Sequence, residues 1–341
     1  MQSYYTILYK FIRIFFIVFI FTLLFDLIFT NFVKIVLPYN FLDMPNNSKA
    51  NTRNFKQNIN SSYYSEINGK IKFCTDKYGL RIKCKSKKKN NNFDFLILGN
   101  IFTEGKHLNH SDSFFGMIEL SNPNLNFANF GVSSMQIEDY YNLVNQIIYN
   151  NEFKFDHLVI YLDQSNFQIG KDDNKALDIK KNGSKIKFFI RNNFYIYLKL
   201  YKFLLFNFNK EKLWAYSPSN HYNHWNENNL NTIKEIHKKK INILNDIYFL
   251  LNSVNKKFSI GIYPYPYDFL YNNKKSNFVK LINDFCYLKC YNYFNSFPIF
   301  YQHLNKNNQW ELIEKYFLKY SVHHNKKGNL LIMQNFNKTI H

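Results

Sequence analysis

One segment determines the architecture of this 341-residue chain: Phe93-Asp94-Phe95-Leu96-Ile97-Leu98-Gly99-Asn100-Ile101-Phe102-Thr103-Glu104-Gly105. An apolar run of strand length ends at Gly99, and Gly105, six residues later, opens what reads as a helix. Parallel α/β sheets place their sites at the carboxyl ends of strands, and a turn of this kind presents one side chain there. The segment therefore predicts an α/β fold with a site at residues 100–101.

Further apolar runs predict the remaining strands of the same sheet. They lie near residues 125–130, 157–163, 258–263 and 291–295, besides the strand at 93–98. Helical periodicity fills the segments between them, most clearly from Leu230 to Val254. Strands that alternate with helices favour a parallel, doubly wound sheet. We therefore expect one α/β domain with five parallel strands.

Three more segments carry polar residues that such a sheet could bring together. Asn129-Phe130-Gly131-Val132-Ser133-Ser134 follows the second run and precedes an amphipathic segment, Gln136 to Asn150. The third run continues from Phe155 into Asp163-Gln164-Ser165-Asn166. A last segment reads Ser321-Val322-His323-His324-Asn325-Lys326-Lys327-Gly328-Asn329. Hydroxyl, amide and imidazole groups thus lie far apart in the chain but on segments that one sheet edge can collect.

In this order the four segments resemble the sequence blocks of the SGNH/GDSL hydrolases. Those blocks read Gly-Asp-Ser followed by Phe-Thr-x-Gly, then Asn-x-Gly-Val-Ser-Gly, a third block that ends in Asn, and Asp-x-His-x-Asn-x-x-Gly. The resemblance covers roughly residues 66–335. It implies a flavodoxin-like three-layer sandwich with a parallel five-stranded sheet, and we expect neither a cofactor nor a metal ion.

The resemblance assigns catalytic roles to positions of this chain. Ile101 occupies the position of the nucleophilic serine, with Asn100 in place of the preceding aspartate. His323 occupies the position of the catalytic base, and Ser321 that of the aspartate that orients it. In such hydrolases the serine attacks an acyl carbonyl and the histidine takes its proton. An isoleucine cannot attack a carbonyl, so the nucleophile and the orienting carboxylate are both missing.

The resemblance also implies where an oxyanion hole would lie. Ser134 occupies the position of a glycine that donates its backbone N–H. Ser165 occupies the position of an asparagine whose amide donates, although a shift of one residue would assign Asn166 instead. Such donors stabilise the tetrahedral oxyanion and commonly make the largest electrostatic contribution to acyl transfer.

Three functions remain compatible with these residues. The first is a catalytically impaired protein, a pseudoenzyme, that acts in cell-envelope or surface-polysaccharide metabolism. The second is an active carbohydrate O-acyl esterase or acyltransferase with a non-standard nucleophile, for which Thr103 and Ser133 are candidates. Asp163 is then either a substitute carboxylate or simply a helix cap. The third is a structural domain without a pocket, and we favour the first.

A narrower likeness indicates the partners. Thr75-Asp76-Lys77-Tyr78-Gly79-Leu80-Arg81 resembles the opening segment of large membrane-anchored SGNH proteins, which are often associated with bacterial surface polysaccharide. A carbohydrate or an envelope protein is therefore the expected partner. The net charge of +20 comes almost entirely from lysine, whereas base readout and bidentate phosphate binding favour arginine, so we expect no nucleic acid.

The amino-terminal residues predict a membrane anchor. Ile14 to Val33 is apolar except for Asp26 and Asn31, and twenty residues can span roughly 30 Å of hydrocarbon. No small-residue cleavage site follows, which favours an uncleaved single-pass anchor with the domain in the periplasm. We expect an anchor at 1–34, a polar tether at 35–65 and a hydrolase-like domain at 66–341 with an irregular insertion at 170–228.

Three features stay open at this point. Placing an ionisable side chain such as Asp26 in the hydrocarbon region costs free energy. Asp26 therefore either has a partner or a function, or lies near the interface and reaches water. Tyr195 to Phe208 is apolar and aromatic, but its lysines and its length favour a buried or surface-lying helix over a second span. Disulfides are favoured over free thiols and over zinc for two close cysteine pairs, Cys74 with Cys84 and Cys286 with Cys290.

Overall fold

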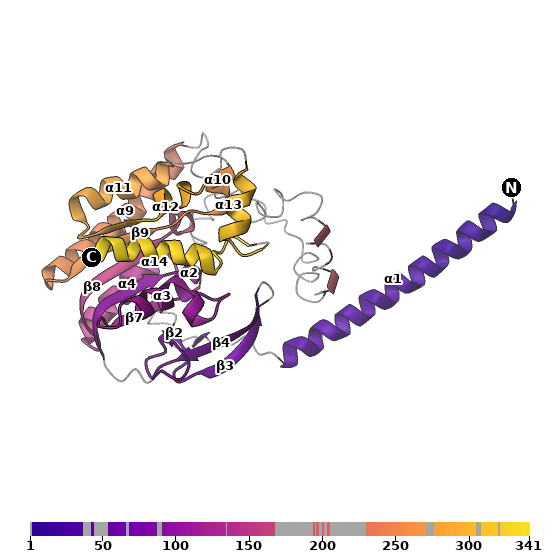
Figure 1. Ribbon diagram of the computed structural model, residues 1–341, viewed down its shortest axis with the longest axis horizontal. Coiled ribbons are helices and arrows are strands. Elements are labelled where there is room, and N and C mark those ends of the chain that lie inside the picture. Colours follow the sequence, from indigo (N-terminus) through magenta and orange to yellow (C-terminus); the bar gives the residue numbers. More distant parts are fainter. Residues whose placement is uncertain are drawn as a thin grey trace. The chain divides into compact units, whose positions relative to one another are not determined.

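The computed structural model describes residues 2–36, 42–43, 54–65, 68–86, 91–133, 135–167, 194, 196–197, 200, 203–204, 230–270, 276–304, 308–319 and 321–341. They belong to two compact units, whose elements are labelled in Figure 1. The smaller unit combines Met1–Tyr39 with Lys171–Leu213, and the larger combines Asn40–Gly170 with Trp214–His341.

A parallel sheet forms the centre of the larger unit. Its five strands are β6 (Asn92–Gly99), β7 (Phe127–Gly131), β8 (Lys154–Leu162), β9 (Lys257–Ile262) and β10 (Tyr293–Asn295), in the order β10-β9-β8-β6-β7. Every neighbouring pair is parallel, which confirms the predicted sheet. The chain order reverses between β6 and β8, and α/β folds bind ligands at the carboxyl ends of strands at such a point.

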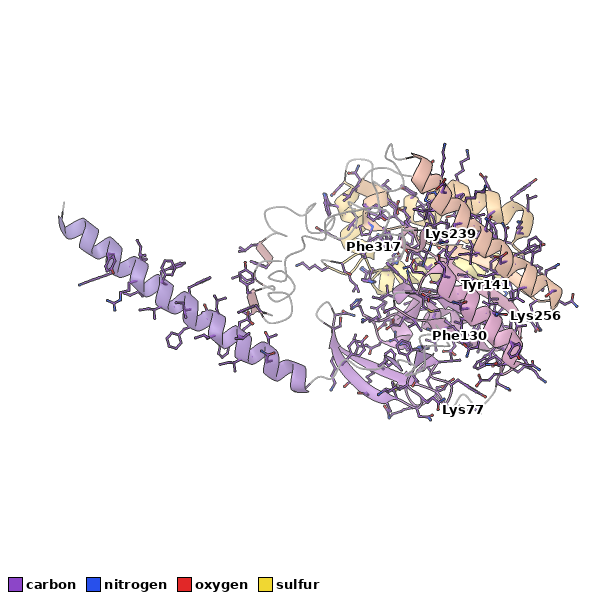
Figure 2. The ribbon with its side chains drawn as sticks, turned by 180° about the vertical axis from the view of Figure 1, so that it is seen from behind. Lys77, Phe130, Tyr141, Lys239, Lys256 and Phe317 are labelled. Atoms are coloured by element: carbon purple, nitrogen blue, oxygen red, sulfur yellow. A yellow bond between two sulfur atoms is a disulfide. The ribbon has the colours of Figure 1, made fainter. Side chains whose placement is uncertain are left out.

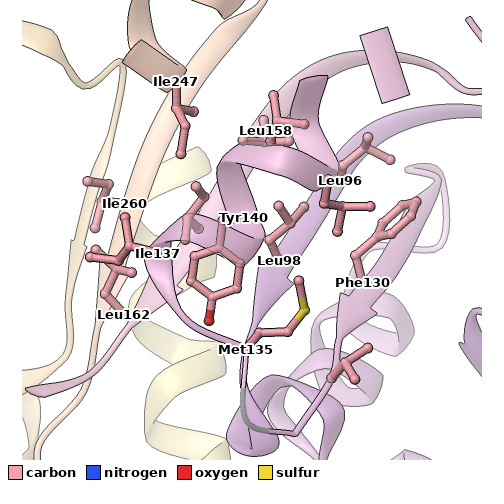
Figure 3. Packing of buried hydrophobic residues seen from close by; sticks show 14 of the residues in the cluster. Leu96, Leu98, Phe130, Met135, Ile137, Tyr140, Leu158, Leu162, Ile247 and Ile260 are labelled. Atoms are coloured by element: carbon pink, nitrogen blue, oxygen red, sulfur yellow. The ribbon is translucent and has the colours of Figure 1, made fainter. Parts of the chain in front are cut away.

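Helices cover one face of this sheet through aliphatic side chains. Leu96, Leu98 and Leu158 belong to one buried apolar cluster with side chains from the helices on this face. Figure 3 shows Tyr140 and Ile247 packed against these strands. The helices are α4 (Ile137–Asn150), which confirms the predicted amphipathic segment, α9 (Leu230–Ser253), which confirms the predicted periodicity, and α11 (Asn277–Lys289).

The opposite face of the sheet is covered through aromatic side chains. Successive strand residues point to opposite faces, so Phe95 lies on the other side of β6 from Leu96. The ring of Phe336 contacts those of Phe95, Phe127 and Phe294. The helices on this side are α14 (Lys326–Ile340) and α3 (Phe114–Ser121). The predicted three-layer α/β sandwich is thus confirmed.

Short antiparallel strands precede the main sheet. β1 (Leu42–Asp43) pairs with β2 (Asn54–Phe55), and β3 (Asn60–Ser65), β4 (Gly69–Thr75) and β5 (Arg81–Ile82) form a three-stranded sheet. Residues 54–65, expected in the polar tether, therefore contribute strands. These residues form strands because their few aromatic side chains pack together: the ring of Phe73 contacts those of Phe55 and Tyr63.

Disulfides join both cysteine pairs of the larger unit. Cys74 at the end of β4 is bonded to Cys84 just after β5. Cys286, within α11, is bonded to Cys290, the residue that follows this helix. Each bridge closes a short loop, so each fixes local geometry more than it links distant parts of the fold.

The smaller unit contains α1 (Gln2–Val36). Within α1, Tyr9–Asn31 is long and apolar enough to cross a membrane. Most of its side chains are exposed and project around the helix axis (Figure 2). Of the insertion expected at 170–228, the structure describes residues 194, 196–197, 200 and 203–204, and the other residues lie outside the described part of the chain.

Candidate active site

The turn after β6 has the predicted position but a different internal structure. Asn100 caps the short helix α2 (Ile101–Glu104), because its Oδ1 accepts from the backbone N–H of Phe102 at 3.2 Å. Gly105 ends this helix with a φ of 69°. The expectation that Gly105 opens a helix is therefore wrong, since its left-handed backbone conformation closes one.

Ile101 and His323 line one small pocket beside this turn. The other lining residues are Phe102, Gly105, Lys106, His107, Leu108, Leu318, His324 and Asn329. The cavity volume is about 10 Å³, roughly what a single water molecule needs. The described residues that line it include no serine, threonine or cysteine. The structure thus brings together the positions expected for the nucleophile and the base, around a small and partly open space.

His323 is held by Ser321 in place of a carboxylate. Ser321 Oγ lies 2.6 Å from His323 Nδ1 and also accepts from the backbone N–H of His323 at 3.2 Å. The His323 ring packs at a tilt against that of Phe102, with 4.8 Å between ring centroids, and against that of His107, with 4.6 Å. Ser321 therefore occupies the orienting position that the sequence assigned to it, but without a charge.

Surroundings of this kind favour the neutral form of His323. Burial lowers its pKa well below the ordinary value, and the nearby His107, His324 and Lys106 act in the same direction. A histidine with a depressed pKa is a weak general base, because its protonated form is disfavoured. An aspartate partner would offset this effect, whereas the Ser321 hydroxyl supplies no compensating charge.

Two of the residues expected in the oxyanion hole, Ser165 and Asn166, make their hydrogen bonds outside this pocket. Ser165 donates its backbone N–H to Asp163 Oδ1 at 2.7 Å, and its hydroxyl donates to the same oxygen. Asn166 is buried and donates through Nδ2 to the Met135 carbonyl at 3.1 Å. Neither residue lines the pocket of Ile101 and His323. Ser134 lies outside the described residues.

The candidate replacement nucleophiles, Thr103 and Ser133, are also absent from the lining of this pocket. Thr103 is fully buried within α2. Ser133 donates its backbone N–H to Glu104 Oε2 at 2.8 Å, and its hydroxyl donates to the same oxygen. Burial raises the pKa of Glu104, and the contact with Ser133 lowers it in part. Neither hydroxyl is among the groups that line the pocket.

A buried polar network joins three strand ends, and the sequence analysis missed it. Asn100 follows β6, Asp163 follows β8 and Tyr263 follows β9. Asn100 Nδ2 donates to Asp163 Oδ2, and the Tyr263 hydroxyl donates to Asn100 Oδ1 at 3.1 Å. The sequence could have indicated this network, because each of the three residues is the first one after an apolar run that forms a parallel strand. Asp163 is thus both a cap for the next turn and a link between strands.

A second missed feature is the support of the loop that carries His107. Arg81 is buried and donates to the carbonyl oxygens of Glu104 and Leu108, the latter at 2.5 Å. His107 Nδ1 lies 3.1 Å from Ser65 Oγ. Burial and nearby positive charges lower the pKa of His107 to about 4. The short antiparallel sheet therefore fixes one wall of the pocket through β3 and β5.

The described residues contain no group of three or more histidine, cysteine, aspartate or glutamate side chains that could hold a metal ion. The fold and the site together define a three-layer α/β protein with a histidine-lined pocket beside the turn after β6.

Comparison with known proteins gives a likeness of fold only. No family model and no curated protein matches this chain. Similar solved structures include a psychrotrophic esterase, EstA, from Pseudoalteromonas sp., with 12% identity, 74% of this chain and 97% of that chain covered, and a TM-score of 0.38. A putative lipolytic protein of the G-D-S-L family from Desulfitobacterium hafniense shows 10% identity, 73% and 99% coverage, and a TM-score of 0.39.

An acetyl xylan esterase, Axe2, from Geobacillus stearothermophilus is similar to the same extent. It shows 10% identity, with 72% of this chain and 93% of that chain covered, and a TM-score of 0.38. All three TM-scores are below 0.5, so the activities of these proteins are not transferred to this chain.

Proposed function

We propose that this chain is a membrane-anchored SGNH/GDSL hydrolase-like protein that is catalytically impaired and acts by binding in cell-envelope or surface-polysaccharide metabolism. The proposal is supported above all by one observation: Ile101 and His323 line the same pocket, and His323 is oriented by Ser321. The arrangement has a histidine at the position of the base and a hydroxyl in place of the carboxylate that would orient it, and it has an alkyl group at the position of the nucleophile.

The chemistry of the pocket supports impairment. Acyl transfer needs a group that attacks the carbonyl, and the described lining residues offer only imidazole, amide, ammonium and hydrocarbon groups. His323 has a lowered pKa and an uncharged partner, so it would activate a neighbouring hydroxyl weakly. Loss of a nucleophile costs orders of magnitude in turnover, and binding alone leaves little.

The disulfides and α1 support the compartment in this proposal. Disulfides persist in oxidising spaces such as the periplasm and are rare in the cytosol, which supports an extracytoplasmic larger unit. The apolar span Tyr9–Asn31 supports a single-pass anchor. The partner in this proposal is a carbohydrate or an envelope protein.

Acetyl-ester hydrolysis by the full chain in detergent tests the proposal. The variants are Ile101→Ser with Ser321→Asp, the same pair with His323→Ala, and a matched control in which Ile101→Ala replaces Ile101→Ser. We expect an inert parent, and at least a ~100-fold gain in the first variant over the matched control that disappears with His323→Ala.

Two other results contradict the proposal. Turnover by the parent that His323→Ala abolishes would establish the alternative, an active carbohydrate O-acyl esterase or acyltransferase with a different nucleophile. A reverted variant that folds but stays inert would favour a structural domain, a reading that the small cavity of about 10 Å³ also supports.

A further inference from the structure

Asp26 has a hydrogen-bonded partner inside the smaller unit. Its Oδ1 accepts from the backbone N–H of Ile196 at 2.9 Å, and its Oδ2 accepts from that of Tyr197 at 2.8 Å. The Thr30 hydroxyl donates to Oδ1 at 3.1 Å. Asp26 is only 3% exposed. Of the two expectations for Asp26, the structure thus supports the one with a partner over the one in which it reaches water.

The contact uses one face of α1. Leu23, Asp26, Leu27 and Thr30 are buried or half-buried, whereas the side chains between them are exposed. Their spacing of three and four residues is that of one helix face. Because two backbone amides donate hydrogen bonds to the Asp26 carboxylate, Ile196 and Tyr197 are bound to a position within the apolar span.

Residues near this contact present exposed apolar side chains. Ile196, Tyr197, Leu200, Phe203 and Leu204 are helical and between 42% and 55% exposed. We call these five residues the apolar stripe. Exposed apolar groups of this size mark surfaces that contact a membrane or another molecule.

We propose that the stripe Ile196, Tyr197, Leu200, Phe203 and Leu204 lies in the membrane interface and contacts lipid directly, held at that depth by Asp26. The inference deepens the proposed function and rests on its membrane anchor. Asp26 precedes Asn31, the end of the span, by five residues, or about 7.5 Å along the helix. An interfacial helix buries its apolar face by about 5–10 Å, so the two depths agree.

The hydrogen bonds between Asp26 and the amides of Ile196 and Tyr197 favour lipid, rather than a protein, as the partner that covers the stripe. A protein partner would need to reach a stripe whose first two amides are bonded to a side chain of the apolar span. A bilayer around Tyr9–Asn31 lies next to this position already. The chain would then have a second membrane contact in addition to its anchor.

Fluorescence quenching by brominated phosphatidylcholine measures the contact. The full chain is reconstituted in vesicles of phosphatidylcholine and phosphatidylglycerol, and its three natural tryptophans give the background in the parent. Leu200→Trp is the test variant. Phe21→Trp, at a position 68% exposed on the span, is the positive control, and Tyr287→Trp, at a position 87% exposed on the larger unit, is the negative control.

We expect the emission added by Leu200→Trp to be quenched at least threefold more than that added by Tyr287→Trp. Adding Asp26→Leu should remove most of this difference. A matched change, Thr22→Leu, replaces an exposed polar residue one helical turn away and should leave the difference in place. Quenching that is insensitive to Asp26→Leu would overturn the role of Asp26.

The outcomes separate this inference from the anchor. If Phe21→Trp is quenched and Leu200→Trp behaves like Tyr287→Trp, the anchor stands and the lipid contact is refuted. If neither Phe21→Trp nor Leu200→Trp is quenched, the anchor itself fails. Absence of quenching together with a two-chain mass in detergent would assign the stripe to a second copy, which also refutes the lipid contact.

Discussion

Replacing Ser321 with aspartate is expected to raise the pKa of His323. In the parent, burial is the main cause that holds this pKa well below the ordinary 6.5. Ser321 Oγ lies 2.6 Å from His323 Nδ1, so an aspartate carboxylate at this position would accept from the ring N–H. The imidazolium would then have an opposite charge beside it.

The magnitude follows from this geometry. Opposite unit charges about 4 Å apart attract by about 4 kcal/mol at an effective dielectric constant near 20, which corresponds to roughly three pKa units. Ser321 is itself buried, so a carboxylate there loses hydration and part of the gain. We expect a net rise of about one to three units.

The sign of the stability change follows from linkage. In the parent, the lowered pKa of His323 means that stability is lost as the pH falls below the unfolded pKa of about 6.5. A raised pKa reduces this loss. The stability of Ser321→Asp relative to the parent should therefore increase from pH 7 to about pH 5.

Histidine NMR titration measures the change directly. The chain has 10 histidines, and the signal of His323 is assigned by its disappearance in His323→Gln. Ser321→Asn is the control, because it has nearly the same size as aspartate and no charge. A pKa of His323 that is equal in Ser321→Asp and Ser321→Asn would refute the electrostatic argument.

Three further changes test the larger unit by chemical denaturation. Burial raises the pKa of Asp268 to about 7, so the stability of the parent should fall as the pH rises from about 4 to 7, by about 4 kcal/mol at most. Asp268→Asn should remove this slope, and a slope that persists contradicts the assignment. Glu138→Ala removes the carboxylate, itself 40% exposed, that lies 2.6 Å from Nζ of the buried Lys240, and should cost about 2 kcal/mol. Adding Lys240→Met should recover most of the loss, and no recovery would show that the buried charge is not its cause. Gly105→Ala places a Cβ 2.7 Å from a neighbouring side-chain carbon at a φ of +69°, and should cost about 2 kcal/mol more than Gly69→Ala. Gly69 has a φ of +74° and open space around it, so equal losses would assign the whole effect to the backbone.

The central sheet was predictable because its strands are covered on both faces. Such strands read as continuous apolar runs, and Phe95-Leu96-Ile97-Leu98 is the clearest of them, with three of its four residues fully buried. The end of each run then marks the carboxyl edge. The same reasoning located Ile101 at the start of the turn, which is where α2 begins.

The short antiparallel strands were not predictable by the same signal. β3 reads Asn60-Ser61-Ser62-Tyr63-Tyr64-Ser65 and has a polar composition typical of a tether. Among the described contacts of β3, the ring of Tyr63 contacts that of Phe73 across the sheet, and Ser65 Oγ lies 3.1 Å from His107 Nδ1. A strand of such polar composition gives no apolar periodicity, so its existence depends on a partner strand that the sequence does not identify.

The direction of side chains is what the sequence blocks could not give. Ser165 and Asn166 occupy a 3-10 turn of four residues, Gln164–Phe167. Asp163 fixes this turn in two ways, since its N–H donates to Asn166 Oδ1 at 2.9 Å and its Oδ1 accepts from Ser165. The spacing of residues in a sequence block gives their order along the chain, but it does not predict which of them form hydrogen bonds with Asp163.

Asp163 also connects this turn to the position expected for a nucleophile. Its Oδ2 accepts from Asn100, the cap of the helix that begins with Ile101. The same carboxylate therefore holds the two segments that an oxyanion hole and a nucleophile would need. Any hydroxyl introduced at Ile101 would stand on a turn already fixed by a buried hydrogen bond, so its reactivity would depend on His323 more than on the mobility of the turn.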